Sequence, residues 1–174
     1  MIILYIIAAV IVLVLIIAAF TGTAWSYEKS IVIQAPVSTV WTHVNSLAAL
    51  NEWSPWAGKD PAMKKEFSGT DGTPGASFAW DSQQKNVGAG SQTIVKVVNE
   101  SALDTRIDFL RPFKGVADAT VAIAPETGGT RATWKIKSST PYPMNIIKVF
   151  GVIEKNMDRD FNAGLTKLKA LSEG

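Results

Sequence analysis

The stretch that decides the fold is IIKVFGVIEKNMDRDFNAGLTKLKAL, residues 146–171. Polar side chains alternate there with apolar ones that recur every three or four positions, as in an amphipathic helix. The apolar positions are Ile146, Phe150, Ile153, Met157, Phe161, Leu165 and Leu168. The spacing predicts one long C-terminal helix of about 25 residues. Its apolar face must be buried against another layer of the protein.

Strand-like segments upstream of this helix provide that layer. Residues 28–34 alternate, with Ile31 and Ile33 on one face, as in a half-buried strand. Six further segments are separated by turn residues and also predict strands: 63–67, 76–81, 91–99, 104–110, 116–124 and 130–138. Strands this close together, without helices between them, imply an antiparallel meander.

Two short helices are expected directly after the first strand. Pro36 suits the first turn of a helix, and apolar residues at helical spacing continue it to about Ser46. Residues 47–53 predict a second short helix, because Pro55 forces Ser54 into an extended conformation. A meander curls around what it covers. A curled sheet that holds one helix leaves space at one end, so we expect an apolar pocket that the short helices help to close.

The N-terminal stretch Ile2–Phe20 contains no charged residue and no proline. About 19 helical residues span about 28 Å, close to the hydrocarbon thickness of a bilayer. The remaining chain is too small to surround a helix that is apolar on every side. We therefore expect a transmembrane anchor at 1–21, a linker at 22–27 and a water-soluble domain at 28–172.

A cleaved signal peptide is the competing interpretation of this stretch. Gly22-Thr23-Ala24 is a passable cleavage site, but no Lys or Arg precedes the apolar run, as a signal peptide would require. The loop-charge rule predicts membrane orientation from charges near the helix ends, but the charges of Glu28 and Lys29 cancel after this helix. We expect the domain on the periplasmic, extracytoplasmic side. Trp25 and Tyr27 suit the headgroup layer or simply begin the domain.

Several kinds of chemistry are excluded by residue counts. The chain has no Cys and one His, His43, so metal sites built from clusters of these residues are absent. His43 lies off the apolar stripe of its helix and is expected at the surface. No nucleophile elbow, P-loop or dinucleotide motif is present. A net charge of +2 without a basic stretch argues against a nucleic-acid partner. We predict no catalytic residue, no metal and no cofactor.

Charged residues within the strands remain to be considered. Asp81, Asp108 and Asp118 are the candidates for a buried acid or base, although alternation directs Asp108 to solvent. Three cations are candidates for contact with an anionic headgroup, or otherwise lie on the outer face of the sheet, which is the usual place for them. They are Arg106, Arg131 and Lys135.

Aromatic residues are the most informative class, with six Trp and seven Phe. We expect the ligand-binding side chains on the concave face and the helix, where plain core is the alternative. They are Phe78, Trp80, Phe109, Trp134, Phe150, Met157 and Phe161. Trp53 and Trp56, on either side of Ser54-Pro55, are expected to form a lid over the pocket, or else a packed corner.

The element order β-α-α-β6-α resembles the START-related helix-grip superfamily (SRPBCC), in its polyketide cyclase/dehydrase-like branch. The residues that carry the resemblance extend from Tyr27 to Leu171: Lys29-Ser30-Ile31-Val32-Ile33, Ala35-Pro36, Val40-Trp41, Trp53-Ser54-Pro55-Trp56, Asp60-Pro61, Gly75, Trp80, Gly88, Gly90, Phe109, Pro112-Phe113, Gly129-Thr130-Arg131, Trp134, Phe161, Gly164-Leu165 and Leu168-Lys169. Their order is specific for the fold but not for a reaction. The resemblance implies an α+β fold, with a curled antiparallel sheet around the C-terminal helix and a cavity for a hydrophobic ligand. Members bind lipids, sterols or polyketides, and a minority catalyse cyclisation or dehydration.

The sequence supports three hypotheses about function. The leading expectation is a membrane-anchored domain that binds a hydrophobic small molecule, lipid-like or polyketide-like, without catalysis. The second is a polyketide cyclase or dehydratase that uses a buried carboxylate with pocket water. The third is a chaperone-related or protein-interaction module, with a filled interior and an exposed apolar patch. The oligomeric state is left open.

Overall fold

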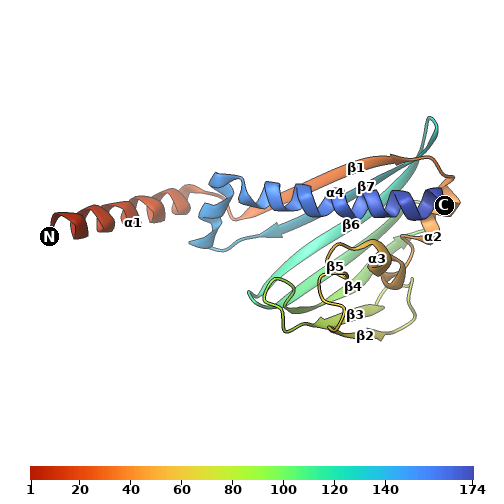
Figure 1. Ribbon diagram of the computed structural model, residues 1–174, viewed down its shortest axis with the longest axis horizontal. Coiled ribbons are helices and arrows are strands. Elements are labelled where there is room, and N and C mark those ends of the chain that lie inside the picture. The colour runs from red at the N-terminus through yellow and green to blue at the C-terminus, as the bar shows by residue number, and fades with distance from the viewer.

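The computed structural model describes residues 1–174 and confirms the α+β helix-grip architecture, in which one curled sheet holds a C-terminal helix. Figure 1 shows the N-terminal helix α1 (Ile2–Phe20) extending away from this domain. Seven antiparallel strands follow the order β1-β7-β6-β5-β4-β3-β2. Their bounds are β1 Ala24–Ile33, β2 Lys64–Ser68, β3 Ser77–Asp81, β4 Ala89–Val98, β5 Ala102–Arg111, β6 Gly115–Glu126 and β7 Gly129–Ser139.

The two edges of the sheet differ in their cover. β1 is the first strand of the domain but pairs with the last, β7, so that the N- and C-terminal parts of the domain lie together. The terminal helix α4 (Val152–Glu173) packs along β1. At the opposite edge, β2 pairs only with β3, and all five of its residues are exposed.

The C-terminal helix is shorter than the prediction. A 3-10 helix, η1 (Met144–Phe150), comes first, and α4 begins at Val152 instead of at Ile146. Gly151 separates them with φ +63°, a left-handed conformation that suits glycine and ends a helix. The apolar spacing continues through Gly151, which is why the pattern alone predicted a single helix.

The core is built where α4 meets the sheet. Phe161, fully buried, stacks on Trp134 of β7, with 4.1 Å between ring centroids. Tyr27 of β1 contacts the ring of Phe161 edge-on at 5.2 Å. Gly164 lies one turn further along α4, and a Cβ atom at this position would come within 2.8 Å of the Trp134 ring. Helix and sheet therefore approach closely here because residue 164 has no side chain.

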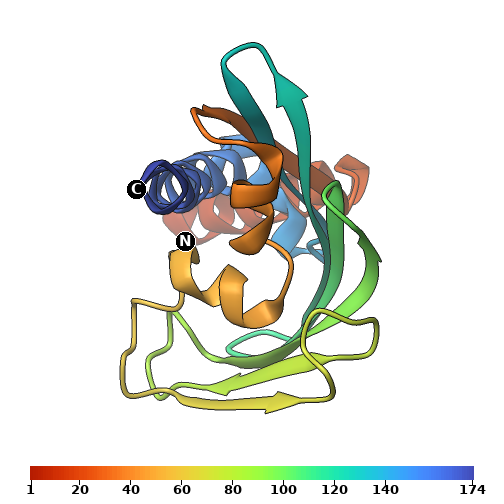
Figure 2. The same ribbon diagram turned by 90° about the vertical axis from the view of Figure 1, so that its right-hand side faces the viewer.

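The sheet has two ends that are built differently. The near end, where α1 joins, contains residues 82–88 between β3 and β4, residues 111–115 at the turn from β5 to β6, and the segment 140–151. The far end contains the turns at 69–76, 99–101 and 127–128, together with α2 (Val37–Thr42) and α3 (Leu47–Trp53). Figure 2 looks onto this far end, where the two short helices lie inside the curve of the sheet.

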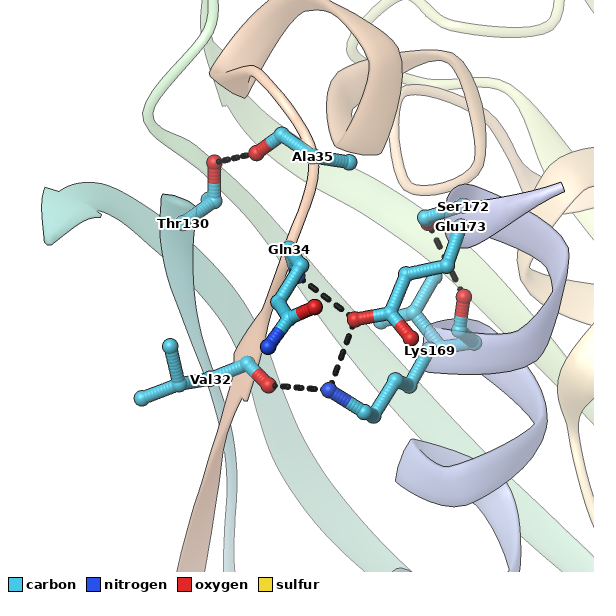
Figure 3. Close-up of polar contacts among 8 residues, drawn as sticks. Val32, Gln34, Ala35, Thr130, Lys169, Ser172 and Glu173 are labelled. Carbon is cyan, nitrogen blue, oxygen red and sulfur yellow. Dashed lines mark hydrogen bonds and ion pairs between the residues drawn. The ribbon is translucent and has the colours of Figure 1, made fainter. Parts of the chain in front are cut away.

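Polar contacts fasten the last turn of α4 to β1 at the far end (Figure 3). The Lys169 ammonium donates to the Val32 carbonyl at 2.8 Å and to the Glu173 carboxylate at 2.6 Å. That carboxylate also accepts from the backbone N–H of Gln34, at 2.6 Å. These two donors hold the pKa of Glu173 below its usual value, with the Lys169 contact as the larger cause.

At the near end, η1 closes onto the end of α1. The Asn145 amide donates to the carbonyls of Ala18 and Thr21, at 2.8 and 2.6 Å. The Lys148 ammonium donates to the carbonyls of Gly22 and Ala24, at 2.5 and 2.6 Å. A helix leaves its last carbonyls without intrahelical partners, and its C-terminus attracts cations. Here η1, more than 100 residues away in the sequence, supplies both a hydrogen-bond donor, Asn145, and a cation, Lys148.

The join between α1 and the domain is shorter than the predicted linker. β1 begins at Ala24 instead of Glu28, and Trp25 and Tyr27 pair with Ser138 and Ile136 of β7. Ala18 is the one buried residue of α1. By length and composition α1 is able to cross a membrane, and an N-terminal signal sequence has the same properties.

Candidate functional site

An apolar cavity of about 380 Å³ opens between the concave face of the sheet, α3 with the loop after it, and α4. This volume falls within the range of about 300–1,000 Å³ that is usual for small-molecule sites. Of the 26 lining residues, 18 are hydrophobic. The cavity occupies the near half of the domain, because its lining on β7 runs from Trp134 to Ser138 and its lining on β6 from Ala117 to Val121.

Strand alternation builds the wall of the cavity. Ala117, Ala119 and Val121 of β6 face inward, and the residues between them face the other side of the sheet. The short side chains of Ala117 and Ala119 leave room that larger residues would fill. In the far half of the same strand Ile123 is buried without lining the cavity. The space therefore results from small residues at particular inward positions.

Five of the seven residues predicted to contact a ligand line the cavity: Phe78, Trp80, Phe109, Trp134 and Met157. Phe161 does not, because it lies behind Trp134 in the packed core. The placement of Phe150 on the concave face was wrong, since its side chain is 72% exposed. The break at Gly151 removes Phe150 from the stripe of α4 and places it on η1.

Trp53 and Trp56 both line the cavity, on the side of α3. Trp53 is 1% exposed, and its indole N–H donates to the His43 carbonyl at 2.8 Å. Both indoles meet Trp134 edge-on, at 4.9 Å for Trp53 and 5.6 Å for Trp56. Trp53 is thus a buried, hydrogen-bonded part of the wall, which fits the packed corner, whereas Trp56 is half-buried and its role as a lid stays a prediction.

The polar groups of the cavity are few. The Gln92 amide donates to the Thr105 hydroxyl at 2.9 Å, and this hydroxyl contacts the Ala119 carbonyl at 3.3 Å. The other polar liners are Asn51, Ser54, Asn86, Arg111 and Ser138. Asp and Glu are missing from the lining. Sequence alternation could have indicated that Thr105 faces inward, but nothing marked its pairing with Gln92.

The three candidate carboxylates lie outside the cavity. Asp81 forms an ion pair with Arg111, Asp108 lies 3.7 Å from Arg106 at the surface, and Asp118 is exposed. Two buried carboxylates, Asp60 and Asp160, were not among the residues proposed as a buried acid or base. Neither lines the cavity.

Both buried carboxylates already have partners. Asp60 accepts from the Ser82 hydroxyl and from the Ala62 N–H. Asp160 accepts from Arg159 at 2.9 Å and lies 3.4 Å from the Lys59 ammonium. Their positions and partners give them structural roles.

The remaining charged candidates are also placed away from the cavity. His43 is partly buried, not fully at the surface, and its Nδ1 lies 3.5 Å from Glu52. Lys135 pairs with Glu28 at 2.9 Å, and Arg131 pairs with Glu126 at 2.6 Å. The Arg131 contact lowers the pKa of Glu126. No three His, Cys, Asp or Glu side chains gather as a metal site would require.

The mouth of the cavity lies at the near end. The exposed members of the lining are Asn86, between β3 and β4, and Arg111, Pro112 and Phe113, at the end of β5 and in the turn after it. Phe113 is 76% exposed. None of these four was predicted to belong to the site, because no periodic pattern marks loop residues that meet only in the folded chain.

Solved structures share this fold at low sequence identity. A putative uncharacterized protein from Rhizobium leguminosarum has a TM-score of 0.62 at 16% identity, with 87% of this chain and 96% of that one covered. A protein from Chromobacterium violaceum gives 0.60 at 17% identity, covering 86% and 97%. The di-domain ARO/CYC StfQ of the steffimycin biosynthetic pathway gives 0.64 at 12% identity, covering 87% of this chain and 51% of that chain.

Sequence comparison agrees with the fold. No curated protein matches the chain. The family described as "Polyketide cyclase / dehydrase and lipid transport" matches residues 24–173, from the first residue of β1 to the last of α4. The chain therefore belongs to the polyketide cyclase/dehydrase and lipid transport family.

Proposed function

We propose that this protein binds a hydrophobic small molecule, lipid-like or polyketide-like, in its cavity, without catalysis, while α1 holds it in a membrane. The family and the fold imply a hydrophobic ligand-binding domain. The observation that carries the proposal is the cavity itself, which is lined by 18 hydrophobic residues out of 26 and by no carboxylate.

The lining indicates the ligand's chemistry. Rings of Phe78, Trp80, Phe109 and Trp134 offer apolar contact over most of the wall. The linked Gln92 and Thr105 side chains offer one polar position within it. A mostly apolar molecule with one carbonyl or hydroxyl group suits this arrangement, because a few placed polar groups fix a ligand's orientation.

Two observations weigh against the alternative functions. A cyclase or dehydratase that uses a buried carboxylate needs this group within reach of the bound molecule, and no Asp or Glu lines the cavity. A protein-interaction module was expected to have a filled interior, whereas this interior is hollow over about 380 Å³.

Retention of α1 is supported by its contacts with η1. Cleavage after Ala24 would remove the carbonyls of Ala18 and Thr21 from the Asn145 amide, which is buried. The proposal therefore keeps α1 as an anchor, and N-terminal sequencing of the mature protein tests this. A sequence that begins at Trp25 would contradict the anchor. We further propose that the domain lies on the periplasmic side, as expected from the sequence.

Ligand binding is tested with full-length protein in lipid nanodiscs and a pair of matched variants. Ala119→Leu places a larger side chain into the cavity, while Ala124→Leu adds the same atoms at an exposed position of the same strand. We expect Ala119→Leu to weaken binding of a fluorescent fatty acid about tenfold or more, which is about 1.4 kcal/mol. Ala124→Leu should bind as wild type does. Equal binding by both variants, or a wild-type protein without bound lipid in native mass spectrometry, would contradict the proposal.

A further inference from the structure

The exposed apolar side chains of the domain are concentrated at its near end. Beyond Phe20, twelve large apolar residues are exposed, and eight of them lie in residues 110–116 and 142–152. The most exposed are Phe113, at 76%, and Phe150, at 72%. Surfaces of this kind mark sites of interaction with a protein or a membrane.

These two segments lie at the same end of the sheet. Ala117, just after the first segment, pairs with Ser138 of β7, and Ser138 pairs with Trp25 of β1. The second segment contains Lys148, which binds the carbonyls of Gly22 and Ala24. Figure 1 shows η1 beside the end of α1 and the β5–β6 connection on the same side of the domain.

The loops at the near end are also positively charged. The near-end segments 82–88, 111–115 and 140–152 contain Lys85, Arg111, Lys114 and Lys148 but no Asp or Glu. Neither Lys85 nor Lys114 forms an ion pair. Lysines beside exposed aromatic residues are suited to an anionic lipid surface.

The contacts of η1 fix the direction in which this surface faces. Asn145 is 1% exposed, and it holds two carbonyls at the end of α1. η1, whose exposed side chains include Val149 and Phe150, therefore lies next to the place where α1 ends. A bilayer crossed by α1 would reach its headgroup layer there.

We propose that the near end of the domain lies in the headgroup layer of an anionic bilayer and that the cavity exchanges its hydrophobic ligand directly with this bilayer. The inference rests on the proposed anchoring by α1. The partner is the lipid surface that α1 enters, because η1, which carries part of these apolar and cationic residues, contacts the end of this helix. The cavity mouth at Arg111, Pro112 and Phe113 belongs to that surface, so a ligand would not cross open water.

Single-cysteine reporters test the inference, since the chain has no Cys of its own. A fluorophore is attached to the full-length variants Phe113→Cys and Phe150→Cys at the near end. Thr127→Cys in the far-end turn is the matched control, and Ala9→Cys reports on α1. Each variant is placed in nanodiscs that contain phosphatidylglycerol and nitroxide-labelled lipids. The nitroxide lies near the headgroups in one series and deep in the bilayer in the other.

We expect the headgroup nitroxide to quench the labels at 113 and 150 but not the label at 127. Labels at 113 and 150 that stay as bright as the one at 127 would overturn the inference. If the deep nitroxide still quenches the label at Ala9, the anchoring stands and only the contact of the near end fails. An unquenched Ala9 label contradicts the anchoring itself, and the inference with it.

The lysines are tested in the Phe150→Cys background. Lys85→Glu with Lys114→Glu should reduce quenching at 150, because both cations would be replaced by groups that the anionic surface repels. Unchanged quenching would contradict the part of the inference that assigns these lysines to contact with the anionic bilayer.

Discussion

The near half of the domain is hollow and the far half is packed, although the same strands and the same helix run through both. In the near half, Ala117 and Ala119 face a cavity. In the far half, Ile123, Ala132 and Leu168 are buried without lining it. The difference separates two tasks along one sheet: the far half supplies packing that stabilises the fold, and the near half keeps space for a ligand.

Replacing Phe161 should cause the largest loss of stability. Phe161→Ala deletes a fully buried ring that stacks on Trp134, and we expect a loss of about 3–5 kcal/mol in the free energy of unfolding. Phe109→Ala, the matched change in the cavity wall, removes a half-buried ring that already borders empty space, so its loss should be smaller. Denaturant unfolding of the full-length protein in detergent measures both losses. Equal losses would show that the packed core behind Trp134 and the wall of the cavity do not differ in packing as described.

Gly164→Ala should have a moderate effect, at the place where the two halves meet. Its new methyl group would come within 2.8 Å of Trp134, and overpacking of this kind costs about 1–3 kcal/mol. The ring must then shift, which should change tryptophan fluorescence. Ala163→Ser, at the exposed neighbouring position, is the control and should leave the fluorescence unchanged. A Gly164→Ala variant as stable as wild type would mean that the helix approaches the sheet less closely.

Alkaline pH should loosen the contact between α4 and β1 at Tyr27. Desolvation, together with the hydrogen bond to Asp158, raises the pKa of Tyr27 from 10.0 to about 12. Since the folded state favours the neutral phenol, this contribution to stability is complete below pH 10 and is lost as pH rises towards about 12,. Phenolate absorbance of wild type and Tyr27→Phe should isolate this titration. Ionisation of all tyrosines near pH 10 would contradict it.

The smallest effect is expected from Glu173, at the far-end contact of α4. Its pKa is lowered by Lys169 and by the Gln34 N–H, so its contribution is present above the usual Glu pKa and is lost as pH falls through the lowered value. Glu173→Gln should therefore be slightly less stable than wild type at neutral pH and equal to it in acid. Thermal unfolding across this pH range measures the difference. A constant difference at every pH would mean that the carboxylate charge plays no part.

Periodic patterns in the sequence were sufficient for the strands, for α4 and for much of the cavity wall. Phe78, Trp80, Phe109 and Trp134 were found because alternation assigns each to the inner face of a strand. Such patterns describe one element at a time. They do not show that residue 151 adopts a left-handed conformation, so Phe150 was placed on the wrong surface.

The contacts that the sequence did not reveal join distant segments. Asn145 and Lys148 meet the end of α1 across more than 100 residues, and their polar side chains in an apolar stretch gave no sign of it. Phe113 borders the cavity because the turn from β5 to β6 meets residues of other strands there. Residues of this kind depend on the approach of elements in space, which spacing along one chain does not encode.

The free edge of the sheet has a consequence if α1 confines the protein to a membrane, as proposed above. Copies that diffuse in two dimensions collide often and with similar orientations, which favours edge-to-edge pairing of their sheets. β2 would be the pairing strand, but it is only five residues long and begins Lys64-Lys65-Glu66, all exposed. Short, charged edge strands discourage such pairing. The strand that contributes least to the core is thus the one that protects neighbouring copies from aggregation.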